Sequence, residues 1–134
     1  MNKNVLLLCD DNSSLSQIGQ AVLGKYLKGV TTFSAGVKKS KPLNADVKKA
    51  LIKDGSWSED FHSKTYETLA DDTFDLVIIL SNLSSKQMPE FDENTIVIQI
   101  EYEEPNYSNS TNIERFIKTI KMELIPITRD ILEL

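Results

Sequence analysis

The sequence is poor in the residues that build disulfides and metal centres. Its 134 residues include one cysteine, Cys9, and one histidine, His62. A single cysteine cannot form a disulfide within the chain, and these two residues alone do not give the usual spacing of zinc ligands. We therefore predict no metal site and no bound cofactor.

Long apolar runs and an excess of positive charge are also absent. The first apolar run, residues 5–8, is too short for a signal sequence or a membrane span, which predicts a cytoplasmic protein with no membrane partner. The net charge is −5, with 20 acidic residues against 15 lysines and arginines, which argues against nucleic acid as a partner. The length predicts one domain, residues 1–134.

Short apolar runs alternate with helical patterns along the chain. Runs typical of buried strands lie at 4–8, 29–36, 74–80 and 95–100. Apolar residues recur at helical spacing in the segments 18–26, 44–54 and 111–134. This alternation predicts parallel β-α-β units, and therefore an α/β sandwich of about four strands. Pro126 is expected to kink or interrupt the last helix.

Cys9 lies between the first predicted strand and the first predicted helix. Ligands of open parallel sheets bind beyond the carboxyl ends of the strands, so the loop that begins at Cys9 is a candidate site. The positive end of the following helix would favour the thiolate form of the cysteine. A buried and unreactive cysteine at a strand end explains the same pattern.

Several short motifs follow one another in an order and spacing that are specific in combination. They are the cysteine loop with "NS" at 12–13 and "SQ" at 16–17, "SAG" at 34–36, "NADVKKAL" at 44–51, "HSK" at 62–64, "FDLVIIL" at 74–80 and "EEP" at 103–105. With these motifs the chain resembles the low-molecular-weight protein tyrosine phosphatase and thioredoxin-linked arsenate reductase superfamily. The resemblance implies a flavodoxin-like three-layer sandwich, with a four-stranded parallel sheet in the order 2-1-3-4 and helices on both faces.

The resemblance also implies a pocket for an oxyanion such as phosphate or arsenate. In this superfamily a cysteine attacks phosphorus or arsenic, an arginine six residues later helps the loop amides hold the oxyanion, and an acid before a proline protonates the leaving oxygen. Cys9 matches the nucleophile, and Glu104, which precedes Pro105, matches the acid. Glu104 is equally consistent with a charged turn at the surface.

The predicted anion loop departs from the superfamily pattern in its charges. The loop consists of Asp10, Asp11, Asn12, Ser13, Ser14, Leu15 and Ser16. Leu15 stands where the arginine is expected, and leucine has neither the charge nor the paired hydrogen-bond donors of a guanidinium. Asp10 and Asp11 replace an uncharged residue and a glycine. They either face the pocket and repel an oxyanion, or point to solvent, or cap the helix amides that an anion would otherwise occupy. We expect Cys9 to titrate at or above the usual value of a thiol.

Other loop residues fit the superfamily shape. Asn12 tolerates a left-handed backbone, and both Asn12 and Ser13 can hydrogen-bond to nearby main chain. A simple turn and cap explains these two residues equally well. Ser16 either orients Cys9 or caps the helix that begins there.

The disulfide relay of the arsenate reductases is missing from the sequence. Those relatives use two later cysteines, whereas this chain has Ser81 and Met88 in the corresponding neighbourhood. Neither side chain can exchange a disulfide, so the intramolecular relay cannot operate.

Three functional classes are consistent with these observations. The first is a relative that has lost catalysis and acts as a binding or regulatory module, with an unidentified protein or small oxyanion as its partner. The second is a weak or atypical cysteine-dependent phosphatase or arsenate reductase that uses Cys9 and Glu104. The third is a phosphocysteine carrier similar to the sugar phosphotransferase IIB proteins, although that class does not explain the "SAG" and "EEP" motifs. The missing arginine and the two added aspartates favour the first class.

Overall fold

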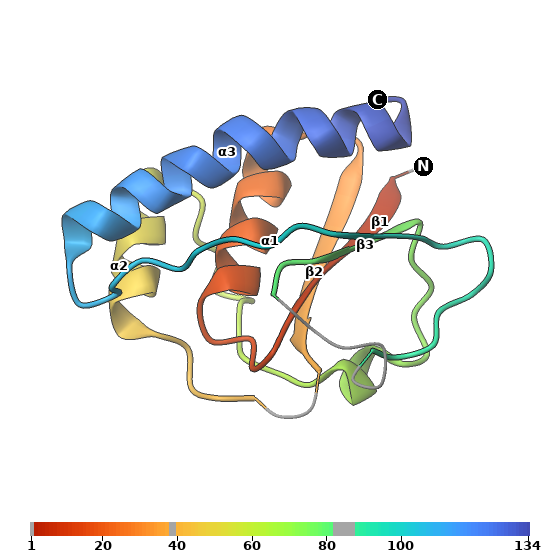
Figure 1. The fold of residues 1–134 in the computed structure, drawn as a ribbon, viewed down its shortest axis with the longest axis horizontal. Coiled ribbons are helices and arrows are strands. Elements are labelled where there is room, and N and C mark those ends of the chain that lie inside the picture. The colour runs from red at the N-terminus through yellow and green to blue at the C-terminus, as the bar shows by residue number, and fades with distance from the viewer. Residues whose placement is uncertain (1, 38–39, 82–87) are drawn as a thin grey trace.

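The fold is a four-stranded parallel sheet packed against helices. The computed structural model describes residues 2–37, 40–81 and 88–134. Its elements are, in chain order, β1 (Lys3–Cys9), α1 (Leu15–Tyr26), β2 (Val30–Gly36), α2 (Ala45–Asp54), the 3₁₀ helix η1 (Tyr66–Leu69), β3 (Leu76–Ile79), β4 (Ile96–Gln99) and α3 (Ser110–Leu132). All strand pairs are parallel, and the order is β2-β1-β3-β4 (Figure 1). The predicted α/β class and strand order are confirmed.

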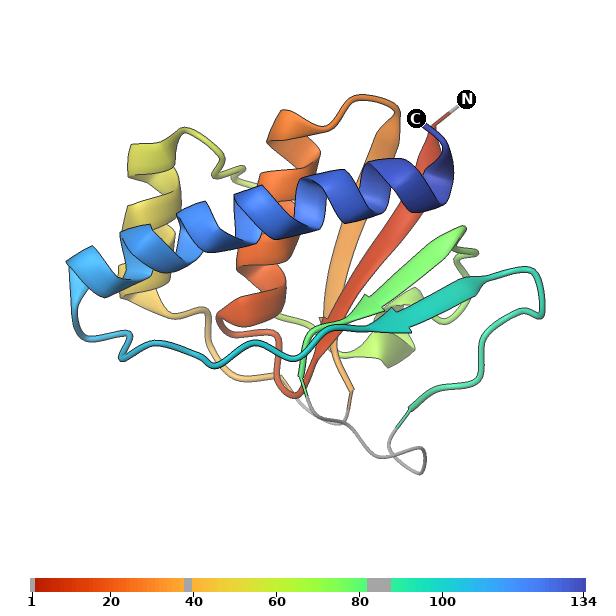
Figure 2. The same ribbon diagram turned by 45° about the horizontal axis from the view of Figure 1, so that its top comes forward.

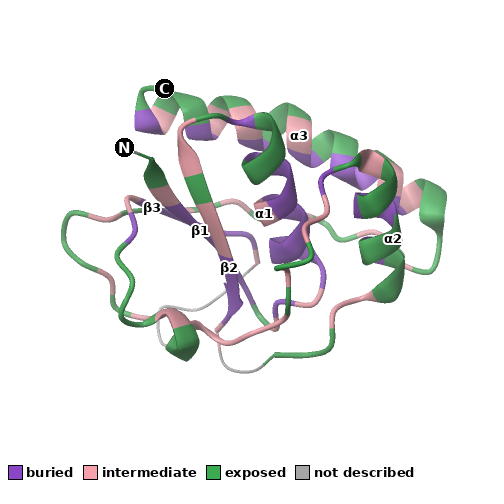
Figure 3. Cartoon of the chain, turned by 180° about the vertical axis from the view of Figure 1, so that it is seen from behind, coloured by how far each residue is buried: buried purple, intermediate pink, exposed green. Residues whose placement is uncertain are grey.

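The hydrophobic core occupies both faces of the sheet. Successive residues of a strand point to opposite faces, so the continuous apolar runs of β1 and β3 supply side chains to both. Leu7 and Ile78 belong to the larger apolar cluster, which α1, α2 and α3 cover. Leu6 and Val77 belong to a smaller cluster on the other face. Figure 3 shows these two strands as the buried centre of the molecule.

The two faces of the sheet are covered by different kinds of structure. The three α-helices lie over one face, as Figure 2 shows for α1 and α3. On the other face, within the residues that the structure describes, the 3₁₀ helix η1 and irregular segments supply the cover through Tyr66, Leu69, Met88 and Phe91. The third layer is therefore mostly irregular in the described part of the chain.

Helix α1 lies very close to the sheet, and a glycine makes this possible. A Cβ atom added at Gly19 would come within 3.1 Å of both the Leu7 and the Leu80 side chains. Ile18 and Val22, on the same side of the helix, are fully buried. Because α1 begins directly after the Cys9 loop, this tight packing also fixes the position of that loop.

Helix α3 is a single element that packs along α1 and α2. It runs without interruption from Ser110 to Leu132, so the predicted interruption at Pro126 is wrong. Pro126 is exposed, whereas Leu124 and Thr128 on either side are fully buried, and this packing holds the two halves of the helix in line. In the described part of the chain, no helix has the length and apolar character needed to cross a membrane.

The connection between β2 and α2 meets the Cys9 loop at three points along the carboxyl edge of the sheet. The amide of Val37, just after β2, donates to the Cys9 carbonyl at 3.0 Å. Further along, the amide of Lys41 donates to the Asp11 carbonyl at 3.0 Å, and the amide of Asn44 donates to the Ser13 carbonyl at 2.9 Å. The connection between β2 and α2 therefore lies along the loop and forms one wall of the candidate site.

Candidate functional site

A cavity of about 260 Å³ opens at the carboxyl end of β1. It is lined by Cys9, Asp10, Asp11, Ser13, Ser14, Leu15, Lys41, Asn44, Ser81, Glu104 and Tyr107. The fold thus brings together the predicted nucleophile and the predicted acid, which are far apart in the sequence. Asn12 and Ser16 do not line the cavity, and both are fully buried in the structure.

The Cys9 thiol is buried and bound to a serine hydroxyl. Its exposed fraction is 5%, and its Sγ lies 2.8 Å from Ser16 Oγ. Asn12 Nδ2 donates to the same Ser16 oxygen at 2.8 Å, which leaves the hydroxyl proton free to point at the sulfur. Ser16 lies inside α1, whose N-cap position is Ser14. Of the two predicted roles of Ser16, the contacts therefore favour orientation of Cys9.

Asn12 connects the loop to a distant part of the chain. Its backbone is left-handed, with φ of 58°, as the sequence predicted for a residue of this type. Its Oδ1 atom accepts hydrogen bonds from the Lys64 amide at 3.0 Å and from Gln17 Nε2 at 3.1 Å. The carbonyl of Asn12 accepts a further bond from Gln17 Nε2 at 3.2 Å. These contacts hold the buried side of the loop in one conformation.

The Asp11 carboxylate occupies hydrogen-bond donors of its own loop. Its Oδ1 atom accepts from the Ser13 amide at 3.1 Å and from the Ser13 hydroxyl at 2.7 Å. Its Oδ2 atom lies 3.7 Å from Lys41 Nζ. Asp11 therefore binds an amide of the loop, because Ser13 precedes the N-cap residue Ser14, and does not cap an amide of α1 as one of the predictions for the aspartates had it. Asp10 is exposed at the cavity.

Leu15 is part of both the cavity wall and the hydrophobic core. It is 3% exposed and packs in the larger apolar cluster. The two arginines of the chain, Arg115 and Arg129, belong to α3. Arg115 lines an adjoining hollow, which shares Glu104 with the Cys9 cavity. Among the residues described, Lys41 is the one basic side chain that lines the Cys9 cavity.

Sequence reasoning missed Lys41 and Asn44 as residues of the cavity. Both lie in the connection between β2 and α2, and connections that follow neighbouring parallel strands meet at the same edge of the sheet. That topological rule was the available signal. Asn44 also has a structural role, since its Oδ1 atom caps α2 by accepting from the amides of Asp46 and Val47.

Burial raises the pKa of the Cys9 thiol above its usual value. The hydrogen bonds from the Ser16 hydroxyl and from the amides of Ser16, Asn12 and Asp11 act in the opposite direction, but burial outweighs them. The direction agrees with the sequence-based expectation. The cause differs, because the expectation invoked the charges of the neighbouring aspartates whereas the structure points to loss of solvent around the sulfur.

Glu104 lies at the mouth of the cavity in contact with a tyrosine. The carboxylate is exposed, and its Oε1 atom accepts a hydrogen bond from Tyr107 Oη at 2.8 Å. Burial and the Glu104 carboxylate both raise the pKa of Tyr107, so the phenol keeps its proton and remains a donor. The Tyr107 ring packs edge-on against Phe116 of α3, which holds this pair in place. Tyr107 is therefore the residue that positions the predicted acid.

The two residues at the predicted relay positions lie in different places. Ser81 lines the Cys9 cavity, whereas Met88 packs in the apolar cluster on the opposite face of the sheet. Residues 82–87, between them, lie outside the described residues.

The cavity offers a thiol, carboxylates, hydroxyls and one ammonium group. Within the three described ranges, no group of three or more histidine, cysteine, aspartate or glutamate side chains is arranged to hold a metal ion. The predicted nucleophile and acid are both present, but the cavity lacks a guanidinium to hold an oxyanion between them.

Comparison with known proteins identifies the fold. No protein-family model matches the sequence, and no curated protein does either. An arsenate reductase from Archaeoglobus fulgidus is similar at 25% identity over 89% of this chain and 99% of that one, with a TM-score of 0.63. A low-molecular-weight phosphotyrosine phosphatase from Vibrio cholerae covers 98% of both chains at 14% identity, with a TM-score of 0.78. The arginine phosphatase YwlE from Geobacillus stearothermophilus is 19% identical over 98% of this chain and 93% of that one, with a TM-score of 0.75.

Proposed function

We propose that this chain, which has the fold of the low-molecular-weight tyrosine phosphatase and arsenate reductase superfamily, is a pseudoenzyme that serves as a binding or regulatory module. The observation that carries the proposal is Leu15, an apolar core residue at the position where the sequence motif calls for arginine. Loss of one oxyanion donor typically slows such a reaction by about 10²- to 10³-fold. A missing guanidinium removes a full positive charge as well.

The other residues of the cavity do not replace the missing charge. Asp11 binds the Ser13 amide and adds a carboxylate to the wall, which opposes the entry of an anion. Burial raises the pKa of Cys9, so the thiolate is scarce at neutral pH. Both changes weaken the first step of phosphoryl transfer, in which the sulfur attacks phosphorus and the leaving oxygen takes a proton from Glu104.

Reduction of arsenate through a disulfide relay is disfavoured for a separate reason. Ser81 and Met88 stand where the relay cysteines are expected, and Cys9 is the only cysteine of the chain. The thiol of Cys9 therefore has no partner within the chain for a disulfide.

A weak cysteine-dependent phosphatase is the second candidate, and Lys41 favours it. Its ammonium group lines the cavity together with Cys9 and Glu104, and it offers a positive charge to an oxyanion. The Lys41 side chain is 59% exposed and lies 3.7 Å from Asp11, so its charge is solvated and partly neutralised. We therefore rank this function second.

An anion screen by thermal unfolding tests the proposal. We expect phosphate, arsenate, sulfate and vanadate at millimolar concentration to leave the melting temperature unchanged. Stabilisation by phosphate or vanadate would contradict the proposal, because any ligand that binds only the native state raises its stability. The Lys41→Met variant is the matched control, since loss of that stabilisation in the variant would establish the second candidate.

The location and the partner belong to the same proposal. We propose a cytoplasmic protein whose residues 1–134 act as one domain. With the oxyanion site weakened, a protein is the favoured partner class over a small oxyanion.

A further inference from the structure

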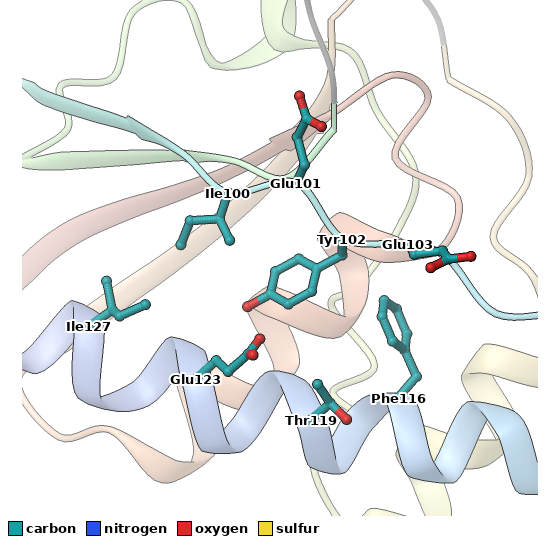
Figure 4. Close-up of a pocket in the computed structure, with 8 residues that line it drawn as sticks. All are labelled: Ile100, Glu101, Tyr102, Glu103, Phe116, Thr119, Glu123 and Ile127. Atoms are coloured by element: carbon teal, nitrogen blue, oxygen red, sulfur yellow. The ribbon is translucent and has the colours of Figure 1, made fainter.

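A second and larger depression lies between residues 100–103 and helix α3. Its volume is about 710 Å³, and none of its lining residues lines the Cys9 cavity. Figure 4 shows its two walls, with Ile100 and Tyr102 on one side and Phe116, Glu123 and Ile127 of α3 on the other. We call this depression the β4–α3 groove. Its size is in the range of sites that take a peptide side chain or a small molecule.

The floor of the β4–α3 groove is apolar. Ile100, Ile127 and the rings of Tyr102 and Phe116 line it. The two rings meet edge-on at 6.0 Å between their centroids, and Phe116 is buried in the core beneath. The floor is therefore anchored to the core, and it presents aliphatic and aromatic surface to the outside.

The rim of the β4–α3 groove is acidic. Glu101, Glu103 and Glu123 line it and are all exposed. Within the described ranges, no lysine, arginine or histidine lines the groove. Three carboxylates around an apolar floor attract a positively charged group and disfavour a negatively charged one.

A buried polar atom in the groove lacks a hydrogen-bond partner. Tyr102 Oη is inaccessible to solvent and has no partner in the part of the chain that the structure describes. Figure 4 shows this hydroxyl directed toward the Glu123 carboxylate. Burial and the charge of Glu123 both raise the pKa of Tyr102, so the hydroxyl stays protonated.

The groove continues into the free edge of the sheet. β4 pairs only with β3 in the described structure. The amides of Ile96 and Ile100 donate toward the β3 side, at 3.1 Å and 2.8 Å. Backbone groups of alternate residues in a strand point to opposite sides, so those of Val97 point to the free edge. Ile96 and Val97 are also 45% and 43% exposed, so this edge offers both hydrogen-bonding groups and apolar surface.

We propose that the β4–α3 groove and the free edge of β4 together bind an extended segment of a partner protein, in which an apolar side chain adjoins lysine or arginine. The segment adds to the sheet beside β4 through backbone hydrogen bonds. Its apolar side chain enters the groove against Tyr102 and Phe116. Its basic side chain lies among the carboxylates of Glu101, Glu103 and Glu123.

This inference goes beyond the proposed function. The groove and the Cys9 cavity are separate, so the peptide site stands whether or not Cys9 is catalytic. A failed anion screen and a failed peptide experiment are therefore distinguishable outcomes.

Selection from a random dodecapeptide library displayed on phage, with the full chain as bait, tests the proposal. We expect enriched sequences to contain lysine or arginine next to an apolar residue. A synthetic peptide of an enriched sequence should bind the Glu101→Lys/Glu123→Lys variant at least about tenfold more weakly than the wild type in fluorescence anisotropy. The Glu67→Lys/Asp71→Lys variant makes the same change in net charge at exposed positions away from the groove, and it should bind within about twofold of wild type.

Amide chemical shifts locate the bound peptide without any substitution. In the ¹⁵N-labelled wild type, we expect the peptide to shift residues 96–103 and 116–127 most strongly. Shifts centred elsewhere would overturn the proposal. So would a selection that enriches no sequence or acidic sequences only, or an equal loss of binding in the two charge-reversal variants.

Discussion

The buried side of the Cys9 loop and its cavity side are built differently. On the buried side, Asn12 and Ser16 form a chain of hydrogen bonds that reaches Cys9, Gln17 and Lys64. On the cavity side, Asp10 is exposed, and the Asp11 side chain bonds only to Ser13 and Lys41 among the described residues. The buried side determines the shape of the loop, and the cavity side determines its charge.

The difference separates the contacts that maintain the fold of the loop from the side chains that set its charge. Buried hydrogen bonds are costly to break, whereas exposed charges contribute little to stability. Leu15 stabilises the fold directly, because full burial of a leucine side chain contributes about 1.5–3 kcal/mol to stability. Leu15 therefore contributes to the stability of the fold at a position where the superfamily motif has an arginine.

The largest effect is expected on the buried side, from Asn12→Ala. This change removes the acceptor of the Lys64 amide and the donor to Ser16, and it leaves alanine with a positive φ. We predict a loss of about 3 kcal/mol in the free energy of unfolding, measured by urea denaturation.

Two control variants separate the parts of that effect. Asn12→Gly loses the same hydrogen bonds but tolerates the left-handed backbone, so it should be less destabilised than the alanine variant. Asp10→Ala, on the cavity side, should change stability by less than about 0.5 kcal/mol. Equal losses in Asn12→Ala and Asp10→Ala would contradict the division of the loop into two sides.

A smaller effect is expected when the charge of the cavity side is restored. The Leu15→Arg/Asp11→Gly variant adds a guanidinium and frees the Ser13 amide. We predict that it binds vanadate at least about tenfold more tightly than wild type by isothermal titration calorimetry, a difference of about 1.4 kcal/mol. Leu15→Met/Asp11→Gly lacks the added charge and serves as the control. Equal affinity of these two variants would show that the guanidinium does not reach the ligand.

The smallest effect concerns the pKa of Cys9. Burial raises this pKa, so the rate of alkylation by iodoacetamide should rise with pH to a midpoint at or above the ordinary value of about 8.5. Because burial is the main cause, Asp10→Thr/Asp11→Gly should move the midpoint by less than about half a pH unit. A wild-type thiol that already reacts as a thiolate at about pH 6 would contradict this account.

The strands were predictable from their apolar runs and their order from the resemblance to the superfamily, whereas the cover of the sheet was not predictable. The runs in β1 and β3 are apolar at every position, which is typical of strands buried on both faces. The segments that cover the second face show no apolar pattern of this kind, since Tyr66 and Met88 belong to a 3₁₀ helix and an irregular stretch. The uninterrupted α3 at Pro126 reflects tertiary packing that a local rule does not include.

The residues of the candidate site were easier to predict from the sequence than the contacts between them. Cys9 and Glu104 follow strands of one parallel sheet, so topology alone places them at the same edge. The bond from the Ser13 amide to Asp11 depends on the conformation of the loop, which residue types do not determine. The β4–α3 groove was missed because it forms between residues 100–103 and a helix that no pattern pairs with them.

Hydrolysis of p-nitrophenyl phosphate by the wild type and by Cys9→Ser, measured side by side at equal concentration, tests the central claim most directly. If the cavity has kept its shape but lost its capacity for oxyanion chemistry, both proteins should release p-nitrophenol at the same background rate. A wild-type rate above that of Cys9→Ser, lowered again in Glu104→Gln, would contradict the claim and show that the remaining amides and Lys41 support catalysis.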